Sequence, residues 1–205
     1  MTIAETLADF LIETGYDDLS PQAVDHAAMI VASTLASAAC GRHIDSARII
    51  TEIERERGGA EEASLWYEAS AKLPVVGAAR ANALMSDAAA SDDSDLRNIV
   101  HAGTPLTATA LAVAEATGAS GQDVLAAIVL GYEAAGRIGE SIMPRFDYRG
   151  HHGCMGATFG ATIAAARLFG LDATQTAHAL GLTATSIGGL TKAANTSIAR
   201  EYHAG

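Results

Sequence analysis

Apolar and small residues recur along most of the chain at the three-to-four-residue spacing of α-helices. The first long stretch follows Ser20 and Pro21, a helix-capping residue and a proline at the first helical position. It reads QAVDHAAMIVASTLASAAC and is apolar or small on nearly every side, which predicts a central, buried helix. An amphipathic helix is expected next over residues 44–59, where a glycine pair ends it.

The helical pattern continues through the rest of the chain. Residues 63–70, ASLWYEAS, fit either a strand or an edge loop, and residues 74–90 resume a helix of small side chains. Thr104 and Pro105 begin another helix. Two later starts have capping-box spacing, Ser120 with Asp123 and Asp172 with Gln175. The pattern predicts an all-α fold in one helical domain over residues 1–205.

Composition and charge limit the classes of partner that the protein can bind. The chain has 205 residues, 49% of them hydrophobic, and a net charge of −11, which argues against nucleic acid and anionic membranes as partners. Residues 1–96 hold 6 basic and 17 acidic side chains, so they carry the whole −11, whereas residues 97–205 hold 7 of each. Five of the seven histidines also lie in the second part, which is therefore the better place for an anion site.

The N-terminus and the cysteines bear on the compartment. The sequence MTIAETLADF is acidic and amphipathic and lacks the basic start and apolar stretch of a signal peptide. Cys40 and Cys154 suggest no disulfide framework. We therefore expect a cytoplasmic protein.

The stretch ASDDSDLRNIVHAGTPL, residues 90–106, gathers Asp92, Asp93, Asp95 and His101 just before a helix start. One interpretation is a solvated turn, because Asp and Ser bond to nearby backbone groups. The other is a site: adjacent carboxylates raise one another's pKa, and a helix N-terminus favours a bound anion that a histidine could protonate. A Mg²⁺ or Ca²⁺ site is less favoured, because the spacing lacks the glycine and final glutamate of an EF-hand loop.

A second cluster, DYRGHHGCMGATFGA at residues 147–161, places Arg149, His151 and His152 before a glycine-flanked helix start. It is either a surface loop or a positive concavity made by the arginine and the helix N-terminus. Neither the adjacent histidines nor Cys154 complete a zinc-ligand pattern.

A third group lies in AREYHAG, where Arg200 and His203 share one face if that segment is helical; a frayed terminus is the alternative. His178 lies in TQTAHALGL and is expected to be a packed histidine. The chain contains no GxGxxG, P-loop or GxSxG motif, so dinucleotide, nucleotide and acyl-serine chemistry have no support.

Several blocks in order resemble the MmgE/PrpD family, which includes 2-methylcitrate dehydratase, cis-aconitate decarboxylase and iminodisuccinate epimerase. They are the acidic stretch with its histidine, the alanine-rich helix leading to GYE…R, and HHGCMGATFGATIAAARLFGLDATQTAHALGLTATSIGGL. The resemblance implies an all-helical large domain, a small α+β lid domain, a homodimer and cofactor-free lyase or isomerase chemistry on small polycarboxylates. Because family members are more than twice as long, this chain is expected to be the N-terminal portion of the large domain, without the lid.

Matching the family's motifs residue by residue implies the site. The family's acidic pair falls on Asp92 and Asp93 and its loop histidine on His101, whereas the next block's histidine falls on His151 or, one residue later, His152. Ala90 replaces the first aspartate of the family's DxDD, and Arg200 replaces its lysine. Both departures argue against decarboxylation of the cis-aconitate type, since arginine is no practical proton donor.

These observations lead to one functional hypothesis and one alternative. We expect dehydration, hydration or epimerisation of a small di- or tricarboxylate, without cofactor or metal. The expected catalytic residues are His101, His151, Asp92 and Asp93, and the expected substrate-binding residues are Arg149, Arg200, His152 and His203. The alternative is a non-catalytic, truncated helical subunit or interaction module of a split MmgE/PrpD-type enzyme. In either case we expect a homodimer, or a partner chain that supplies the missing domain.

Overall fold

Helices account for most of the regular secondary structure of the chain. The computed structural model of the protein describes residues 2–96, 100–142, 152–189 and 201–205. In chain order its elements are α1 (Ile3–Glu13), a 3-10 turn η1 (Tyr16–Asp18), α2 (Pro21–Gly41), α3 (Asp45–Arg57), β1 (Ala63–Ser64), β2 (Lys72–Leu73), α4 (Val75–Ala88), α5 (Gly103–Thr117), α6 (Gly121–Ile142), α7 (His152–Leu168) and α8 (Ala173–Ser186). The predicted all-α fold is confirmed.

Local hydrogen bonds begin three of these helices where the sequence predicts. The Ser20 hydroxyl accepts from the Ala23 amide at the start of α2. The Ser120 and Asp123 side chains exchange bonds with each other's backbone amides before α6. Asp172 and Gln175 form the reciprocal capping box of α8. These interactions span three residues, so they follow from sequence alone.

The segment at residues 63–70, which fits a strand or an edge loop, contains both. Its first two residues form β1, which pairs antiparallel with β2 so that Ala63 faces Leu73. The rest is a turn that is hydrogen-bonded to α4, because the Trp66 amide donates to the Asn82 side chain at 2.9 Å. Asn82 is 1% exposed, so this bond satisfies a buried polar group.

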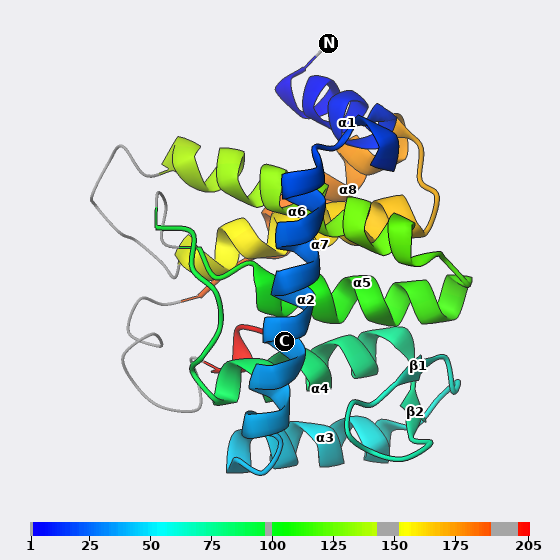
Figure 1. Cartoon of the computed structure of the whole chain (residues 1–205), viewed down its shortest axis with the longest axis vertical. Helices are drawn as coiled ribbons and strands as arrows, with labels where there is room; N and C mark the ends of the chain where they lie inside the picture. Colours follow the sequence, from blue (N-terminus) through cyan, green and yellow to red (C-terminus); the bar gives the residue numbers. More distant parts are fainter. Residues whose placement is uncertain (1, 97–99, 143–151, 190–200) are drawn as a thin grey trace.

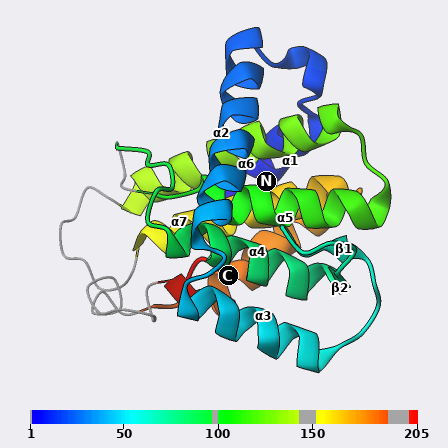
Figure 2. The ribbon, with the colours of Figure 1, turned by 60° about the horizontal axis from the view of Figure 1, so that its bottom comes forward.

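The helices stack along the long axis of the molecule, and α2 runs across them (Figures 1 and 2). One core cluster lies between α2, α3, α4, α5 and the β1–β2 hairpin, and a second lies between α2, α5, α6 and α7. Alanine supplies many of the buried residues in both clusters. Small side chains allow neighbouring helices to approach closely, as the composition suggests.

Helix α2 is not the buried central helix that its sequence predicts. Among the helices it packs mainly against α4, α5 and α6, and its buried residues are Ala27, Thr34, Ser37, Ala38 and Gly41. The opposite face is open, with Met29 58% exposed. A helix that is apolar all round has no preferred side, so its sequence could not tell how much of it this chain covers.

Helix α2 is also the one helix among the described residues that is long and apolar enough to cross a membrane, with a mean hydropathy of 1.4 in its most apolar window. Only 22% of that window is buried within the chain. Core helices of soluble proteins and N-terminal signal sequences share this length and composition, so the finding does not by itself indicate a membrane segment.

Candidate active site

The acidic stretch and His101 meet in the loop before α5. Asp95 and Val100 form an isolated antiparallel bridge, with the Asp95 amide donating to the Val100 carbonyl at 2.9 Å. This bridge folds the loop back, so Asp92 and Asp93 reach His101 although they lie nine and eight residues earlier. Val100 is 1% exposed and packs in a core cluster with Ala157 of α7, which anchors the loop.

Asp93 turns its carboxylate inward, toward the beginning of α5. One oxygen, Oδ1, accepts from the Gly103 amide at 2.8 Å, and the other accepts from the Tyr132 hydroxyl of α6. Burial raises the pKa of the Asp93 carboxyl, and these two donors oppose that rise. The N-cap residue of α5, Ala102, makes no side-chain cap, so Asp93 provides from a distance the acceptor that a local capping residue normally supplies.

The Asp93 carboxylate requires a glycine at position 103. A Cβ added to Gly103 would lie 2.3 Å from Asp93 Oδ1 and 2.8 Å from the Tyr132 hydroxyl oxygen. The first residue of α5 therefore has no side chain because a carboxylate and a phenol occupy that space.

His101 lies against the other side of the same loop. Its Nδ1 is 2.7 Å from the Asp93 backbone carbonyl oxygen and 3.2 Å from Asp92 Oδ2. The His101 side chain is 48% exposed, whereas that of Asp92 is 12% exposed. The hydrogen bond to Asp92 raises the pKa of His101 to about 9, against the opposing effect of burial. The ring is thus oriented at Nδ1 and reachable by solvent.

This geometry revises two sequence-based interpretations. The sequence suggests that neighbouring aspartates raise one another's pKa, but burial is the main cause at Asp93, and Asp92 contributes less. The sequence also suggests that the start of α5 is open to an anion, yet the Gly103 amide already donates to Asp93. Both differences arise because the chain turns the Asp93 side chain into the fold and leaves Asp92 beside the histidine.

Several predicted site residues lie outside the described residues. They are Arg149, His151 and Arg200. His152 is the first residue of α7, and its side chain is likewise not described. Their convergence on His101 stays a prediction. The start of α7 does lie beside the His101 loop, because a Cβ added to Gly156 would be 3.1 Å from a Val100 methyl group.

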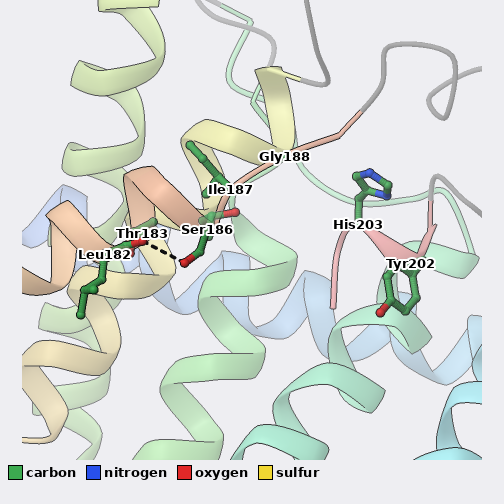
Figure 3. A pocket seen from close by; sticks show the side chains of 8 residues that line it. Leu182, Thr183, Ser186, Ile187, Gly188, Tyr202 and His203 are labelled. Carbon is green, nitrogen blue, oxygen red and sulfur yellow. Dashed lines mark hydrogen bonds between the residues drawn. The ribbon is translucent and has the colours of Figure 1, made fainter.

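His203 lines a separate cavity of about 440 Å³. The end of α8 and the residues that follow it form one side, and Tyr202 and His203 form the other (Figure 3). Thr158 of α7 also lines it, and the Ser186 hydroxyl donates to the Leu182 carbonyl at 2.9 Å. The described lining of this cavity does not include His101 or its two aspartates. His178 lies elsewhere: it is exposed on α8, not packed as the sequence suggests.

Metal ligation has no structural support in the described part of the chain. No group of three or more His, Cys, Asp or Glu side chains there is placed to hold a metal ion. Asp93 in particular directs both carboxylate oxygens at hydrogen-bond donors. Cys40 is an exposed free cysteine.

Tyr132 is the site residue that the sequence pattern does not single out. In the sequence it is only one of three residues, with Val124 and Ile128, that share a face of the predicted helix. A usable signal is nevertheless present, because a tyrosine on a buried face needs a hydrogen-bond partner for its hydroxyl. The acidic stretch at residues 92–95 offers carboxylate acceptors for such a donor.

Comparison with protein families gives a match over nearly the whole chain. Residues 5–205 match the MmgE/PrpD N-terminal domain. No curated protein sequence matches the chain.

Proposed function

The chain belongs to the MmgE/PrpD family, as its N-terminal domain, and we propose that it carries out carbon-acid chemistry on a small di- or tricarboxylate. The reaction is dehydration and hydration, or epimerisation, with no cofactor. The observation that carries this proposal is the contact of His101 Nδ1 with Asp92 at 3.2 Å, on a ring that is half exposed at the start of α5. A carboxylate beside imidazole is a common way to orient a proton-transferring histidine.

The protonation state of His101 defines its role. With a pKa of about 9, His101 is an imidazolium near neutral pH. Because Nδ1 faces Asp92 and the Asp93 carbonyl, Nε2 is the nitrogen that can reach a substrate. His101 therefore begins as a proton donor and as a positive partner for a substrate carboxylate. It takes a proton back in the reverse direction.

A second group must remove the proton from carbon. In dehydration, the base takes the proton next to a carboxylate, an enolate-like charge develops, and the hydroxyl leaves as water with a proton from the acid. We assign the role of acid to His101. His151, which comes just before α7, would be the base on the opposite side of the substrate. In epimerisation the same two residues would act on opposite faces of one carbon. Substrate carboxylates would be bound by Arg149, Arg200, His152 and His203.

Solvent exchange tests the proposal whichever net reaction follows. Small di- and tricarboxylates are incubated with the longest native form of the protein in heavy water, and deuterium at carbon is followed by NMR. The same spectra also follow loss of water and inversion at carbon, the steps that need the acid. His101→Gln should lower this net turnover by about a hundred- to ten-thousandfold, the usual contribution of a general acid or base. His178→Gln, an exposed histidine on α8, is the matched control and should turn over at the wild-type rate. Wild-type turnover in the His101 variant would remove that residue from the mechanism.

One observation favours the alternative, a non-catalytic helical subunit. The outer face of α2 leaves Met29 and small residues such as Ala32 and Ala36 open to solvent, as expected of a helix that another chain covers. Either a second copy in a homodimer or a partner chain with a lid domain would cover this face of α2. We place either assembly in the cytoplasm. Mass in solution together with the exchange assay separates the two functions. An assembled protein with no exchange on any of these acids would favour the subunit.

A further inference from the structure

We infer that Tyr132 is a positioning residue: its hydroxyl on α6 holds Asp93, and through Asp93 it fixes the surroundings of the His101 ring. The inference deepens the proposed function and rests on it for its catalytic meaning. Tyr132 makes no described contact with the His101 ring. Its hydroxyl donates to the Asp93 carboxylate, and the carbonyl of the same Asp93 residue faces His101 Nδ1 at 2.7 Å.

Two donors from different helices hold the Asp93 carboxylate. The Gly103 amide of α5 donates to one oxygen at 2.8 Å, and the Tyr132 hydroxyl of α6 donates to the other. Neighbours of Tyr132 on α6 are firmly packed, with Ile128 0% and Ala135 1% exposed. The phenol is therefore presented from a rigid element, whereas the aspartates lie on a loop. A loop residue fixed at both carboxylate oxygens also has its backbone carbonyl fixed.

Electrostatics keep Tyr132 in the role of a donor. Burial raises the pKa of the Tyr132 hydroxyl, and the negative charges of Asp93, Asp95 and Asp92 raise it further. The hydroxyl thus keeps its proton at any working pH and cannot serve as a base. Its proton is directed at Asp93, so a positioning role fits its chemistry and a proton-transfer role does not.

Loss of the hydroxyl should lower the pKa of His101 for two reasons. With one donor fewer, the partly buried Asp93 carboxylate is harder to ionise, and its negative charge is one of the causes that raise the pKa of His101. The Asp93 side chain also loses one of its two donors, which loosens the Asp93 carbonyl and the Asp92 carboxylate around Nδ1. Both effects lower the pKa of His101.

The test is an NMR titration of the His101 ring in the 205-residue chain, its resonance assigned by its loss in His101→Gln. We expect Tyr132→Phe to move the pKa of His101 down from about 9 toward the ordinary value of about 6.5. Tyr67→Phe is the matched control, because that hydroxyl donates to the Leu35 carbonyl away from the site. It should leave the pKa of His101 unchanged. An unchanged pKa in Tyr132→Phe overturns the inference.

A double variant tests the route through Asp93. If Tyr132 acts through that carboxylate, adding Tyr132→Phe to Asp93→Asn should produce no further shift at His101, whereas two full, additive shifts would contradict it. If Tyr132→Phe alone does not fold, Asp93→Asn should restore folding, because losing both partners costs less than leaving a partly buried carboxylate underpaired. A double variant that also fails to fold would mean that the fold needs the Tyr132 hydroxyl for more than its bond to Asp93, which also overturns the inference.

The titration separates this inference from the proposed function. It needs no substrate, so a shift in Tyr132→Phe supports positioning even if no carboxylic acid exchanges. Where exchange is observed, the pH at which kcat changes should fall with the pKa of His101 in Tyr132→Phe and not in Tyr67→Phe. Absence of exchange in the wild type, with the shift present, would remove the proposed function and leave the positioning role.

Discussion

His101 illustrates how a single ring can have two different environments. Nδ1 is directed at Asp92 and at the Asp93 carbonyl, and the side chain remains 48% exposed. The adjacent aspartates differ in their partners: Asp92 lies beside the histidine ring, and the partly buried Asp93 carboxylate accepts from the first amide of α5. Residues of the same type, next to each other in sequence, thus have different chemistry because Asp92 meets the His101 ring whereas Asp93 meets the Gly103 amide and the Tyr132 hydroxyl.

The raised pKa of His101 makes a prediction for stability. Because the folded pKa of about 9 exceeds the unfolded value of about 6.5, protonation favours the folded state. The stabilisation is complete below about pH 6.5 and is lost as the pH rises through about 9. Solvent screening of this half-exposed pair limits it to on the order of 1 kcal/mol.

Urea unfolding at about pH 6 and about pH 10 measures this contribution. The free energy of unfolding should fall more between these pH values in the wild type than in His101→Gln. Subtracting the fall in His101→Gln from the fall in the wild type cancels the contribution of the other titrating groups. Equal falls in both would show that the His101 pair has no net effect on stability.

At the scale of whole elements, glycines determine how closely α6 and α7 pack. A Cβ added to Gly160 would lie 2.6 Å from the Gly131 carbonyl oxygen, and one added to Gly131 would lie 2.9 Å from that of Gly160. The two backbones are therefore in direct contact at this point. The contact matters for the site because α6 carries Tyr132, one residue after Gly131, and α7 packs against the His101 loop.

Gly160→Ala should therefore destabilise the protein. The methyl group would force α6 and α7 apart, and overpacking of this kind costs about 1–3 kcal/mol. Gly181→Ala in α8 is the control, because a Cβ there meets nothing within 4 Å. It should be neutral or stabilising by up to about 1 kcal/mol, from helix propensity. Chemical denaturation gives both values, and a Gly160 variant as stable as the wild type would contradict the close contact.

Across the whole molecule, α1 packs against α8, so the first helix lies on the last one of the described chain (Figure 1). Arg167 of α7 reinforces this arrangement by donating to the Leu11 carbonyl and, at 3.2 Å, to the Ile12 carbonyl. These carbonyls belong to the last turn of α1, where no intrahelical donor is available. A half-buried guanidinium therefore holds together segments that are far apart in the sequence.

Arg167→Ala should release α1 locally. Hydrogen bonds to a charged group contribute about 1.5–3 kcal/mol, so amide hydrogen exchange in α1 should accelerate by about ten- to a hundredfold. Exchange in α4 and α5 should stay at the wild-type rate. Arg48→Ala removes an exposed pair with Asp45 on α3 and serves as control. Unchanged protection of α1 in the Arg167 variant would show that packing alone holds this helix.

Much of the fold and part of the site are predictable from the sequence. The helix starts at Ser20, Ser120 and Asp172 depend on contacts three residues long, and the acidic stretch with His101 is recognisable as a cluster. The hydrogen-bond partner of Asp93 is not predictable from the sequence, because Tyr132 lies 39 residues away on another helix. The role of Asp92 is not predictable either, since the sequence leaves open which aspartate orients the histidine.

What the sequence by itself determined is local and periodic: the all-α class, the positions of capped helices, the family, and the grouping of acids before a helix start. Only the tertiary structure decided which neighbours those groups meet. It turned Asp93 inward to Tyr132, set Asp92 against His101, and left one face of α2 uncovered. The physical reason is range: helix formation and capping act within one turn of the chain, whereas burial and charge pairing depend on residues brought together from distant helices.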